Sequence, residues 1–364
     1  MKVKDIIYEI ERFAPLAYQE SYDNAGLLVG DREMEVNAVL VTLDCTPEVL
    51  EEALEKGANM ILTHHPVIFS GVKRITGANM VEQILITAIK NDIAIYASHT
   101  NLDSVIGGVN SRICEKIGLE KIEILDPIKA SLSKLVTFVP SEHAEDVQQA
   151  VFNAGAGHIG NYDCCGYNLE GYGSFRANDK ANPFVGNIGE IHKEKEIRFE
   201  TVFPKYLKGR VINALLAAHP YEEVAYDIYS LENEFKQVGI GMVGELKEPV
   251  DELVFLNRLK KIFNAQVVRH TKLLDKPVRK IAVCGGSGSF LLTRAMAAKA
   301  DVFVTGDFKY HQFFEAENKI LVADLGHYET EQFTKDIFYD LIQKKFPNFA
   351  VHLSEINSNP INYL

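Results

Sequence analysis

Two adjacent histidines end a short apolar run, Ile61-Leu62-Thr63-His64-His65-Pro66. The run follows a turn-like Lys56-Gly57, which is typical of the start of a buried strand. Pro66 lacks an amide donor and restricts the residue before it, so we expect the strand to end at the pair. Neighbouring side chains of a strand point to opposite faces, but on an irregular strand end each imidazole can reach a different ion. The pair therefore indicates a two-metal site, with loop histidines bonded to backbone as the alternative.

Other strand ends carry further metal-ligating side chains. The apolar run 93–97 leads into His99 and Asp103, and the run 319–324 leads into His327 and Glu331. His327 and Glu331 are four residues apart at the start of a predicted helix that continues through Leu341, which places both on one face. Ligands of parallel α/β sheets gather beyond the carboxyl ends of the strands. We therefore expect these side chains to meet His64 and His65 at one edge of the sheet.

The expected metal ligands are three imidazoles and two carboxylates, namely His64, His65, Asp103, His327 and Glu331. This set suits borderline divalent ions, with zinc as the first expectation and iron, manganese or nickel as alternatives. The carboxylate of Glu331 could bridge two such ions. We therefore expect two divalent metal ions per subunit, with coordination positions left open for water.

Two more histidines, His99 and His311, are expected on the same edge without being obvious ligands. Each is a candidate for proton transfer or substrate contact, and each could instead orient a metal ligand. A glycine-rich turn follows the buried strand 280–284, and its residues Gly285, Gly286, Ser287 and Gly288 are candidates for binding a phosphate. The turn lacks the Walker lysine and the full dinucleotide fingerprint, so tight packing is an equal alternative.

The order of predicted elements indicates an α/β fold with an insertion. Strands alternate with helices in residues 1–128 and 236–364, which predicts a largely parallel sheet flanked by helices. Residues 129–235 instead show a strand, helix, strands, helix, strand order, which predicts an inserted ferredoxin-like α+β domain. The alternative is that this segment extends the main sheet. Its polar cluster Ala218-His219-Pro220-Tyr221-Glu222-Glu223 could bind a ligand, cap a turn or form a subunit contact.

Composition narrows the class of protein. The chain has 364 residues, 47% of them apolar, yet no run approaches the roughly eighteen apolar residues of a membrane helix. No apolar signal core follows Met1, and the five cysteines are scattered without a CxxC, so we expect a cytoplasmic protein without disulfides or a thiolate zinc site. The net charge of -12 argues against nonspecific nucleic-acid binding, which needs a basic surface.

Several motifs together carry a family resemblance. The stretches are Ser21-Tyr22-Asp23-Asn24-Ala25-Gly26-Leu27, Thr63-His64-His65-Pro66, His99-Thr100-Asn101-Leu102-Asp103, Val304-Thr305-Gly306-Asp307 and Gly326-His327-Tyr328-Glu329-Thr330-Glu331. In their order and spacing the chain resembles the Nif-three-like family, whose bacterial members are called GTP cyclohydrolase 1 type 2 homologues. One departure is Tyr22, where the family usually has Trp, and it should affect packing more than chemistry.

The resemblance implies properties beyond those read from the residues. It implies that His64, His65, Asp103, His327 and Glu331 are the dinuclear metal ligands, that the inserted domain resembles the CutA and PII-like fold, and that the protein forms a toroidal homohexamer. It also implies a metal-dependent hydrolase of GTP cyclohydrolase type, or one acting on another nucleotide-like small molecule. The alternatives are a non-enzymatic hexameric metal-binding or regulatory protein, and a different metallohydrolase that acts on phosphoesters or amides.

Overall fold

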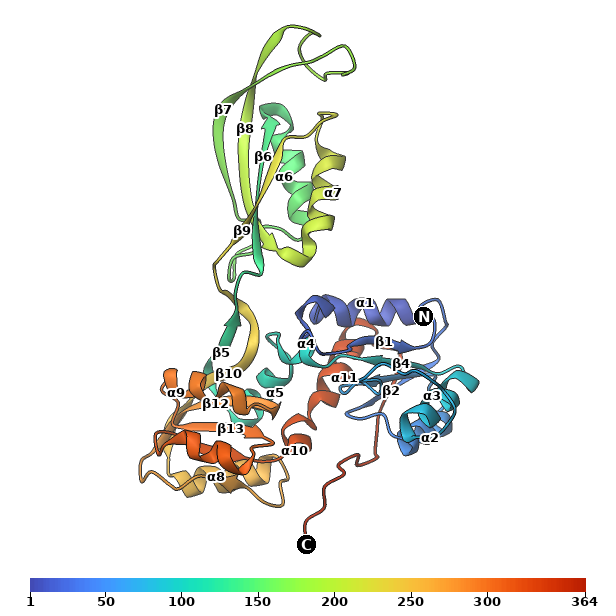
Figure 1. The fold of residues 1–364 in the computed structure, drawn as a ribbon, viewed down its shortest axis with the longest axis vertical. Helices are drawn as coiled ribbons and strands as arrows, with labels where there is room; N and C mark the ends of the chain where they lie inside the picture. Colours follow the sequence, from blue (N-terminus) through green and yellow to red (C-terminus); the bar gives the residue numbers. More distant parts are fainter. The chain divides into compact units, whose positions relative to one another are not determined.

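The computed structural model describes residues 1–364, which form two compact units. One unit combines Met1–Pro127 with Gln237–Leu364, and the other is Ile128–Lys236, coloured green to yellow in Figure 1. No helix of the chain is both long and apolar enough to cross a membrane. The assignment of residues 129–235 as an inserted domain remains a proposal, which the second compact unit supports.

The first unit contains a five-stranded sheet in the order β1-β4-β3-β2-β15. Its strands are β1 (Gly26–Val29), β2 (Ala38–Thr42), β3 (Met60–Thr63), β4 (Ala94–Ala97) and β15 (Ala350–Leu353). All neighbours are parallel except β1, which runs antiparallel to β4. Because side chains alternate along a strand, Leu40 and Ile61 pack on one face with α2 (Pro47–Glu55) and α3 (Met80–Lys90). Val41 and Leu62 face α1 (Val3–Phe13) and α11 (Thr334–Lys345).

A second sheet of the same unit has six strands in the order β11-β14-β13-β12-β10-β5. The strands are β5 (Glu120–Ile128), β10 (Phe235–Val250), β11 (Arg269–His270), β12 (Val278–Ser287), β13 (Val302–Gly306) and β14 (Leu321–Asp324). The central three, β12, β13 and β14, are parallel, whereas β10 runs antiparallel to β12 and β11 runs antiparallel to β14. The helices associated with this sheet are α5 (Val109–Ile117), α8 (Glu252–Ile262) and α9 (Leu292–Ala297).

The α/β fold class is confirmed, but the expectation of one sheet edge for all candidate ligands is wrong. His64, His65 and Asp103 follow strands of the first sheet, and His327 and Glu331 follow β14 of the second. One continuous hydrophobic core contains residues of both sheets, including Leu62, Tyr96 and Val283. Apolar periodicity identifies buried strands without specifying which sheet each one joins, which is why the division into two sheets was not predicted.

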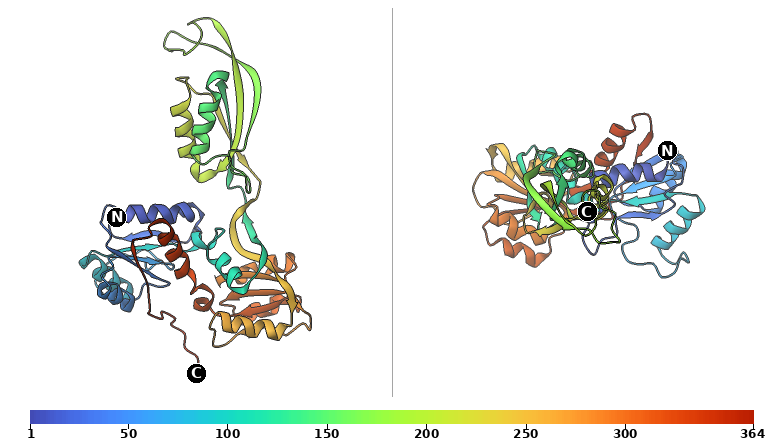
Figure 2. Two further views of the ribbon diagram at one scale, coloured as in Figure 1. Left: turned by 180° about the vertical axis from the view of Figure 1, so that it is seen from behind. Right: turned by 90° about the horizontal axis from the view of Figure 1, so that it is seen from above.

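The second unit is a four-stranded antiparallel sheet in the order β7-β8-β6-β9. Its elements in chain order are β6 (Leu132–Pro140), α6 (Ala144–Asn153), β7 (Gly166–Arg176), β8 (Ile191–Pro204), α7 (Lys208–Ala218) and β9 (Tyr226–Leu231). This βαββαβ order is that of a ferredoxin-like fold, as predicted. Phe199 and Leu135 pack against Val151 and Val211 of the helices, so α6 and α7 cover one face of the sheet (Figure 2). The other face carries no helix of this unit.

Candidate metal centre

The backbone turns at His64-His65, as the sequence predicts. Strand β3 ends at Thr63, and the amides of His64 and His65 both donate to the carbonyl oxygen of Leu43, at 3.1 and 3.0 Å. Two successive amides that share one acceptor cannot continue a regular parallel ladder. The two imidazole rings consequently lie on the same side, with their centroids 4.9 Å apart.

His99 and Asp103 are presented by a single helical turn, α4 (Thr100–Asp103), which follows β4. The amide of His99 donates to the side chain of Asn101 at 2.9 Å, and this bond fixes the start of the turn. The ring centroid of His99 lies 5.3 Å from that of His64 and 5.4 Å from that of His65. The strand end of β4 thus delivers both side chains to the histidine pair.

His327 and Glu331 lie on α10 (His327–Glu331), which follows β14, and the predicted i,i+4 pairing is present. The distance from Nε2 of His327 to Oε2 of Glu331 is 3.0 Å. The glycine turn makes room for this pair, since a Cβ on Gly286 would lie 2.3 Å from Oε1 of Glu331 and 3.1 Å from Cε1 of His327. Gly286 also has a φ of +62°, a conformation that favours glycine.

Three groups of side chains at this place could hold a metal ion. They are His64 with His65 and His99, His65 with His327 and Glu331, and His64 with Asp103 and Glu331. Glu331 belongs to two groups and uses a different oxygen in each. Its Oε2 lies 2.9 Å from Nε2 of His65, whereas its Oε1 lies 3.7 Å from Nε2 of His64. A buried carboxylate that divides its oxygens in this way is suited to bridge two cations.

Each histidine of the cluster has its Nδ1 bonded away from the centre. The Nδ1 partners are the carbonyl oxygen of Ser98 for His64 at 2.9 Å, Asp44 for His65 at 2.6 Å, Asp307 for His327 at 2.7 Å and Asp23 for His99 at 2.8 Å. All four partner atoms are acceptors, so Nδ1 carries the proton in every case. This outer layer is the usual support of metal-binding histidines, and it directs each Nε2 toward the shared centre.

Two buried atoms of the cluster have no hydrogen-bond partner. They are Nε2 of His64 and Oδ1 of Asp103, which lie 3.6 Å apart. Because Nδ1 of His64 donates to Ser98, the neutral ring has a lone pair at Nε2, which faces the lone pairs of Asp103. Buried acceptors without a donor are costly, and a cation between them would remove that cost. The residues present therefore fit a divalent ion.

The charges of the cluster are strongly coupled. Burial raises the pKa of Asp103 to about 7, with a further contribution from the nearby charge of Glu331. Burial is the largest single effect and acts to raise the pKa of Glu331, but the hydrogen bonds and charges of the surrounding histidines, His327 first, together outweigh it and hold that pKa well below its usual range. The cluster therefore keeps an anionic Glu331 in a buried position, where it needs a positive partner.

Protonated imidazoles supply that positive charge when no ion is bound. Burial lowers the pKa of His65, but hydrogen bonds with Asp44 and Glu331 outweigh it and raise the pKa to about 10. Burial likewise opposes protonation of His327, yet Asp307 and Glu331 raise its pKa to about 11. The two Nε2 atoms are 3.2 Å apart, so two imidazolium rings face each other here. A single divalent cation would replace both protons without that repulsion.

The cluster is buried on one side and open on the other. His64 is fully buried and Glu331 nearly so, whereas the side chains of His65 and His327 are 22% and 35% exposed. Asp307, behind His327, is 45% exposed. Water or a small ligand could therefore approach from the side of His65 and His327.

Of the two histidines that were candidates for proton transfer, only His99 lies in the cluster. His99 joins the cluster, with its Nδ1 held by Asp23. His311 belongs to none of the three groups; it is exposed on the 3₁₀ helix η5 (Tyr310–Ala316), and its ring packs on Tyr310. No hydrogen bond or ring contact links His311 to the cluster.

The amides of the predicted phosphate loop already have partners. Gly285 donates to the side chain of Asn110 at 2.9 Å, Gly286 to Thr330 at 3.0 Å and Gly288 to Thr305 at 3.1 Å. Ser287 is still part of strand β12, and a 3₁₀ turn, not an α-helix, follows directly. These amides are not free to cradle a phosphate. The geometry favours the tight-packing alternative, in which the glycines admit Glu331 and His327.

Sequence reasoning gave no role to the carboxylates that hold the histidines, namely Asp23, Asp44 and Asp307. Asp44 follows β2 and Asp307 follows β13, so both lie at strand ends, like the predicted ligands. Asp23 and Asp307 are also part of the stretches that carry the family resemblance. Carboxylates just beyond parallel strands were thus an available signal.

Comparison with known proteins agrees with this fold and shows the family. The family model described as Duf34/NIF3 (NGG1p interacting factor 3) matches residues 1–360. A Bacillus subtilis protein named GTP cyclohydrolase 1 type 2 homolog is 40% identical, over 99% of this chain and 98% of its own length. A relative of the same name from Halalkalibacterium halodurans is 38% identical, again over 99% and 98%.

A solved structure extends the agreement to three dimensions. The crystal structure of a Bacillus cereus protein related to NIF3 superposes with a TM-score of 0.88 at 37% sequence identity. The match covers 100% of this chain and 99% of that one. Because the family model and these relatives span nearly the entire sequence, the chain belongs to the DUF34/NIF3 family.

Proposed function

We propose that this protein binds two divalent metal ions and uses them as a hydrolase. One ion would be held by His64, Asp103 and Oε1 of Glu331, the other by His65, His327 and Oε2 of Glu331. The observation that carries the proposal is the unpaired Nε2 of His64 facing the unpaired Oδ1 of Asp103 in a buried place. Zinc is the first candidate, and iron, manganese and nickel also suit this mixture of imidazole and carboxylate ligands.

A pair of divalent ions at this site would supply Lewis acidity and a water molecule that is acidic enough to act near neutral pH. The chain's own residues would prepare the reaction around it. His99 lies beside the pair with its Nδ1 bonded to Asp23, so its Nε2 is directed toward the cluster and could move a proton. Hydrogen bonds from Thr100 and from His99 offset the effect of burial and lower the pKa of Asp23 to about 2, which keeps it anionic.

The substrate proposal rests on the relatives. Their printed name, GTP cyclohydrolase 1 type 2 homolog, suggests GTP or another nucleotide-like molecule as a substrate for this chain. The exposed side of His65 and His327 offers an approach for such a molecule. We assign no phosphate-binding role to the amides of Gly285, Gly286 and Gly288, because side chains of the protein already occupy them.

One observation favours the non-enzymatic alternative. The five candidate ligands form ion pairs only with histidines and acidic side chains. No lysine or arginine is paired with any of them. A hydrolase acting on a nucleotide usually supplies cations for the phosphates, so a metal-binding or regulatory protein remains a second candidate. In either case we propose that the protein is cytoplasmic and forms a homohexamer, as the resemblance implies. Light scattering of the purified protein would test the hexamer.

The test begins with the protein purified without chelators and with metal per chain measured by mass spectrometry. We expect about two ions per chain, and far less in His64→Ala and Glu331→Gln. His158→Ala is the matched control, since His158 is exposed in the other unit and lies outside the three groups. Two ions retained in both site variants would refute the ligand assignment.

The second part of the test concerns the reaction. The metal-loaded protein is challenged with GTP, with a panel of phosphoesters and with amides, and product is followed by chromatography. We expect turnover of a nucleotide-like substrate that is lost in His64→Ala and kept in His158→Ala. A protein that binds two ions but converts none of these compounds would exclude the tested hydrolase activities and favour the metal-binding alternative.

A further inference from the structure

The unit Ile128–Lys236 contains a pocket that plays no part in the metal site. Its volume is about 560 Å³, and it is lined by residues of β6, β7, β8 and the segments 177–184 and 221–225. Phe199 of β8 points into the core beneath the helices, so alternation along the strand sends Glu196 and Arg198 to the opposite face. The pocket therefore lies on the sheet face that α6 and α7 leave uncovered.

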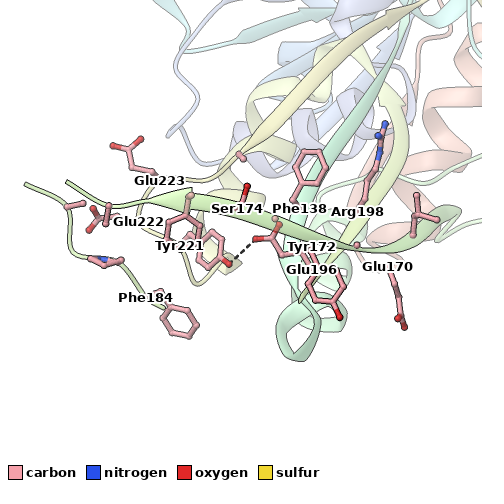
Figure 3. A pocket seen from close by; sticks show the side chains of 18 residues that line it. Phe138, Glu170, Tyr172, Ser174, Phe184, Glu196, Arg198, Tyr221, Glu222 and Glu223 are labelled. Carbon is pink, nitrogen blue, oxygen red and sulfur yellow. Dashed lines mark hydrogen bonds between the residues drawn. The ribbon is translucent and has the colours of Figure 1, made fainter. Parts of the chain in front are cut away.

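Aromatic rings form much of the pocket wall. The five rings are those of Phe138, Tyr172, Phe175, Phe184 and Tyr221. Tyr221 lies between two of them, with its centroid 6.0 Å from Phe175 and 6.3 Å from Phe184. Figure 3 shows the hydroxyl group of Tyr221 at the carboxylate of Glu196. Such rings offer an apolar surface to a ligand body and negative faces to a cation.

Most charged side chains of the pocket are acidic, and few of them are paired with a cation. Its lining includes four glutamates and one arginine: Glu170, Glu196, Glu222, Glu223 and Arg198. The arginine is already paired with Glu200 at 2.8 Å, and Glu170 is paired with Lys195 at 3.1 Å. Neither cation is directed at Glu196, so the pocket has an excess of negative charge.

Glu196 is the central feature of the pocket. The residue is only 7% exposed, and its Oε1 accepts the hydroxyl proton of Tyr221 at 2.9 Å. No lysine, arginine or histidine forms an ion pair with it, although a buried carboxylate is costly without a positive partner. Its Oε2 lies over β7 at Gly173, where a Cβ would be only 2.0 Å away. The absence of a side chain at Gly173 is what allows the carboxylate to lie there.

The tyrosine that binds Glu196 is itself held in place by the polar cluster 218–223. Nε2 of His219 donates to the carbonyl oxygen of Phe138 at 3.0 Å, and its Nδ1 accepts the amide proton of Tyr221 at 3.1 Å. Burial lowers the pKa of His219, which keeps the ring neutral and suited to this double role. The cluster thus acts as a capped turn, and the turn fixes Tyr221 over the pocket.

We propose that this pocket binds a small organic cation, with an ammonium group beside Glu196 and an apolar or aromatic body between the rings. The pocket volume is within the usual range for small-molecule sites, which are mostly apolar with a few placed polar groups. The unpaired buried carboxylate selects positive charge, and the aromatic faces of Phe175 and Tyr221 add cation–π attraction. Glu222 and Glu223 strengthen the negative potential at the same pocket.

The experiment uses the full-length protein and three phenyl compounds that differ in the charge of their terminal group. They are 2-phenylethylammonium, the neutral 2-phenylethanol and the anion phenylacetate, titrated by calorimetry and by tyrosine fluorescence, which the absence of tryptophan leaves unobscured. We expect the ammonium to bind at least tenfold more tightly than the alcohol, and the anion not to bind. Equal binding of ammonium and alcohol would overturn the proposal, as would a failure of all three probes to bind, for instance because a second chain fills the pocket.

Variants identify the group that recognises the charge. Glu196→Gln keeps the shape of the side chain, so we expect at least a tenfold loss for the ammonium and no change for the alcohol. Glu145→Gln is the matched control, because Glu145 is exposed on α6 and is not part of the pocket lining, and it should leave both affinities unchanged. Circular dichroism and metal content verify that Glu196→Gln is folded. A folded Glu196→Gln protein that binds the ammonium as well as the parent does would refute the role of Glu196.

Discussion

His65 and Asp44 are joined by a 2.6 Å hydrogen bond from the imidazole Nδ1 to the carboxylate Oδ1. The other oxygen of Asp44 accepts the hydroxyl proton of Ser358 at 2.5 Å. Ser358 belongs to the segment after β15, far from His65 in the sequence. The orientation of His65 toward Glu331 therefore depends on a carboxylate that is itself held by the C-terminal segment.

We predict that Asp44→Ala weakens metal binding even though Asp44 belongs to none of the three candidate groups. Without the carboxylate the ring of His65 is free to rotate and its Nε2 is less basic, so affinity should fall roughly 10- to 100-fold. Competition with a chromogenic chelator measures the affinity. Ser358→Ala should have a smaller effect, because Asp44 still binds His65, and Ser70→Ala on the exposed surface should have none. An Asp44→Ala protein with parental affinity would contradict this support role.

Metal binding should release protons. In the metal-free protein the pKa of His65 is raised to about 10 and that of His327 to about 11, so both rings are protonated at pH 7.5. An ion bound at Nε2 must displace these protons, and we expect roughly two released per chain. Zinc titration by calorimetry, in buffers with different ionisation enthalpies, counts them. Affinity should rise with pH between 6 and 8 by roughly a hundredfold per unit.

The same pKa values determine how the metal-free protein responds to alkali. Both histidine pKa values are raised above the unfolded value of about 6.5. Their contribution to the free energy of unfolding is therefore fully present below pH 6.5 and is lost as the pH rises through about 10 to 11. The metal-loaded protein should not show this loss, because its imidazoles hold no such protons. Urea unfolding at pH 7 and pH 10 measures the free energy of unfolding of the metal-free and metal-loaded forms. An equal fall of that free energy in both forms would argue against protonated imidazoles in the metal-free site.

Gly286→Ala should lower the metal content without replacing any candidate ligand. The new Cβ would lie 2.3 Å from Oε1 of Glu331, and the φ of +62° strains any residue other than glycine. Glu331 must then move, and both ions would lose the carboxylate they share, so we expect metal content below half that of the parent. Gly71→Ala is the control, because no atom lies within 4 Å of its added Cβ and its φ is not positive. Full metal content in Gly286→Ala would show that Glu331 does not need this gap.

The sequence predicted the elements that deliver the cluster better than it predicted their assembly. The helix at His327–Glu331, the end of β3 at Thr63 and the joining of Asp103 follow from local signals: an i,i+4 pair, a proline and apolar runs. The two-sheet arrangement was missed, and the bounds of strand β7 were not predicted. Strand β7 is almost fully exposed and rich in glycine, so it lacks the apolar alternation that marks a strand.

The glycine turn shows a second limit of local patterns. A glycine-rich strand end is compatible with an anion cradle and with close packing, and the choice depends on which side chains reach the amides. Here Asn110, Thr305 and Thr330 do so, from elements distant in the sequence. Such long-range partners are fixed by tertiary packing, and no spacing rule along the chain reveals them.

The final prediction concerns the two compact units. Leu135 is fully buried in the core of the unit Ile128–Lys236, which shares no core cluster with the metal-bearing unit. Leu135→Ala should lower the free energy of unfolding of that unit by about 2–5 kcal/mol while metal content stays at the parental value. Leu40→Ala, an equally buried leucine of β2, is the matched variant in the other unit and should destabilise the metal-bearing transition instead. Calorimetry with limited proteolysis assigns each transition. If Leu135→Ala lowered both transitions and released the metal, the units would unfold as one and the inserted-domain assignment of residues 129–235 would lose its basis.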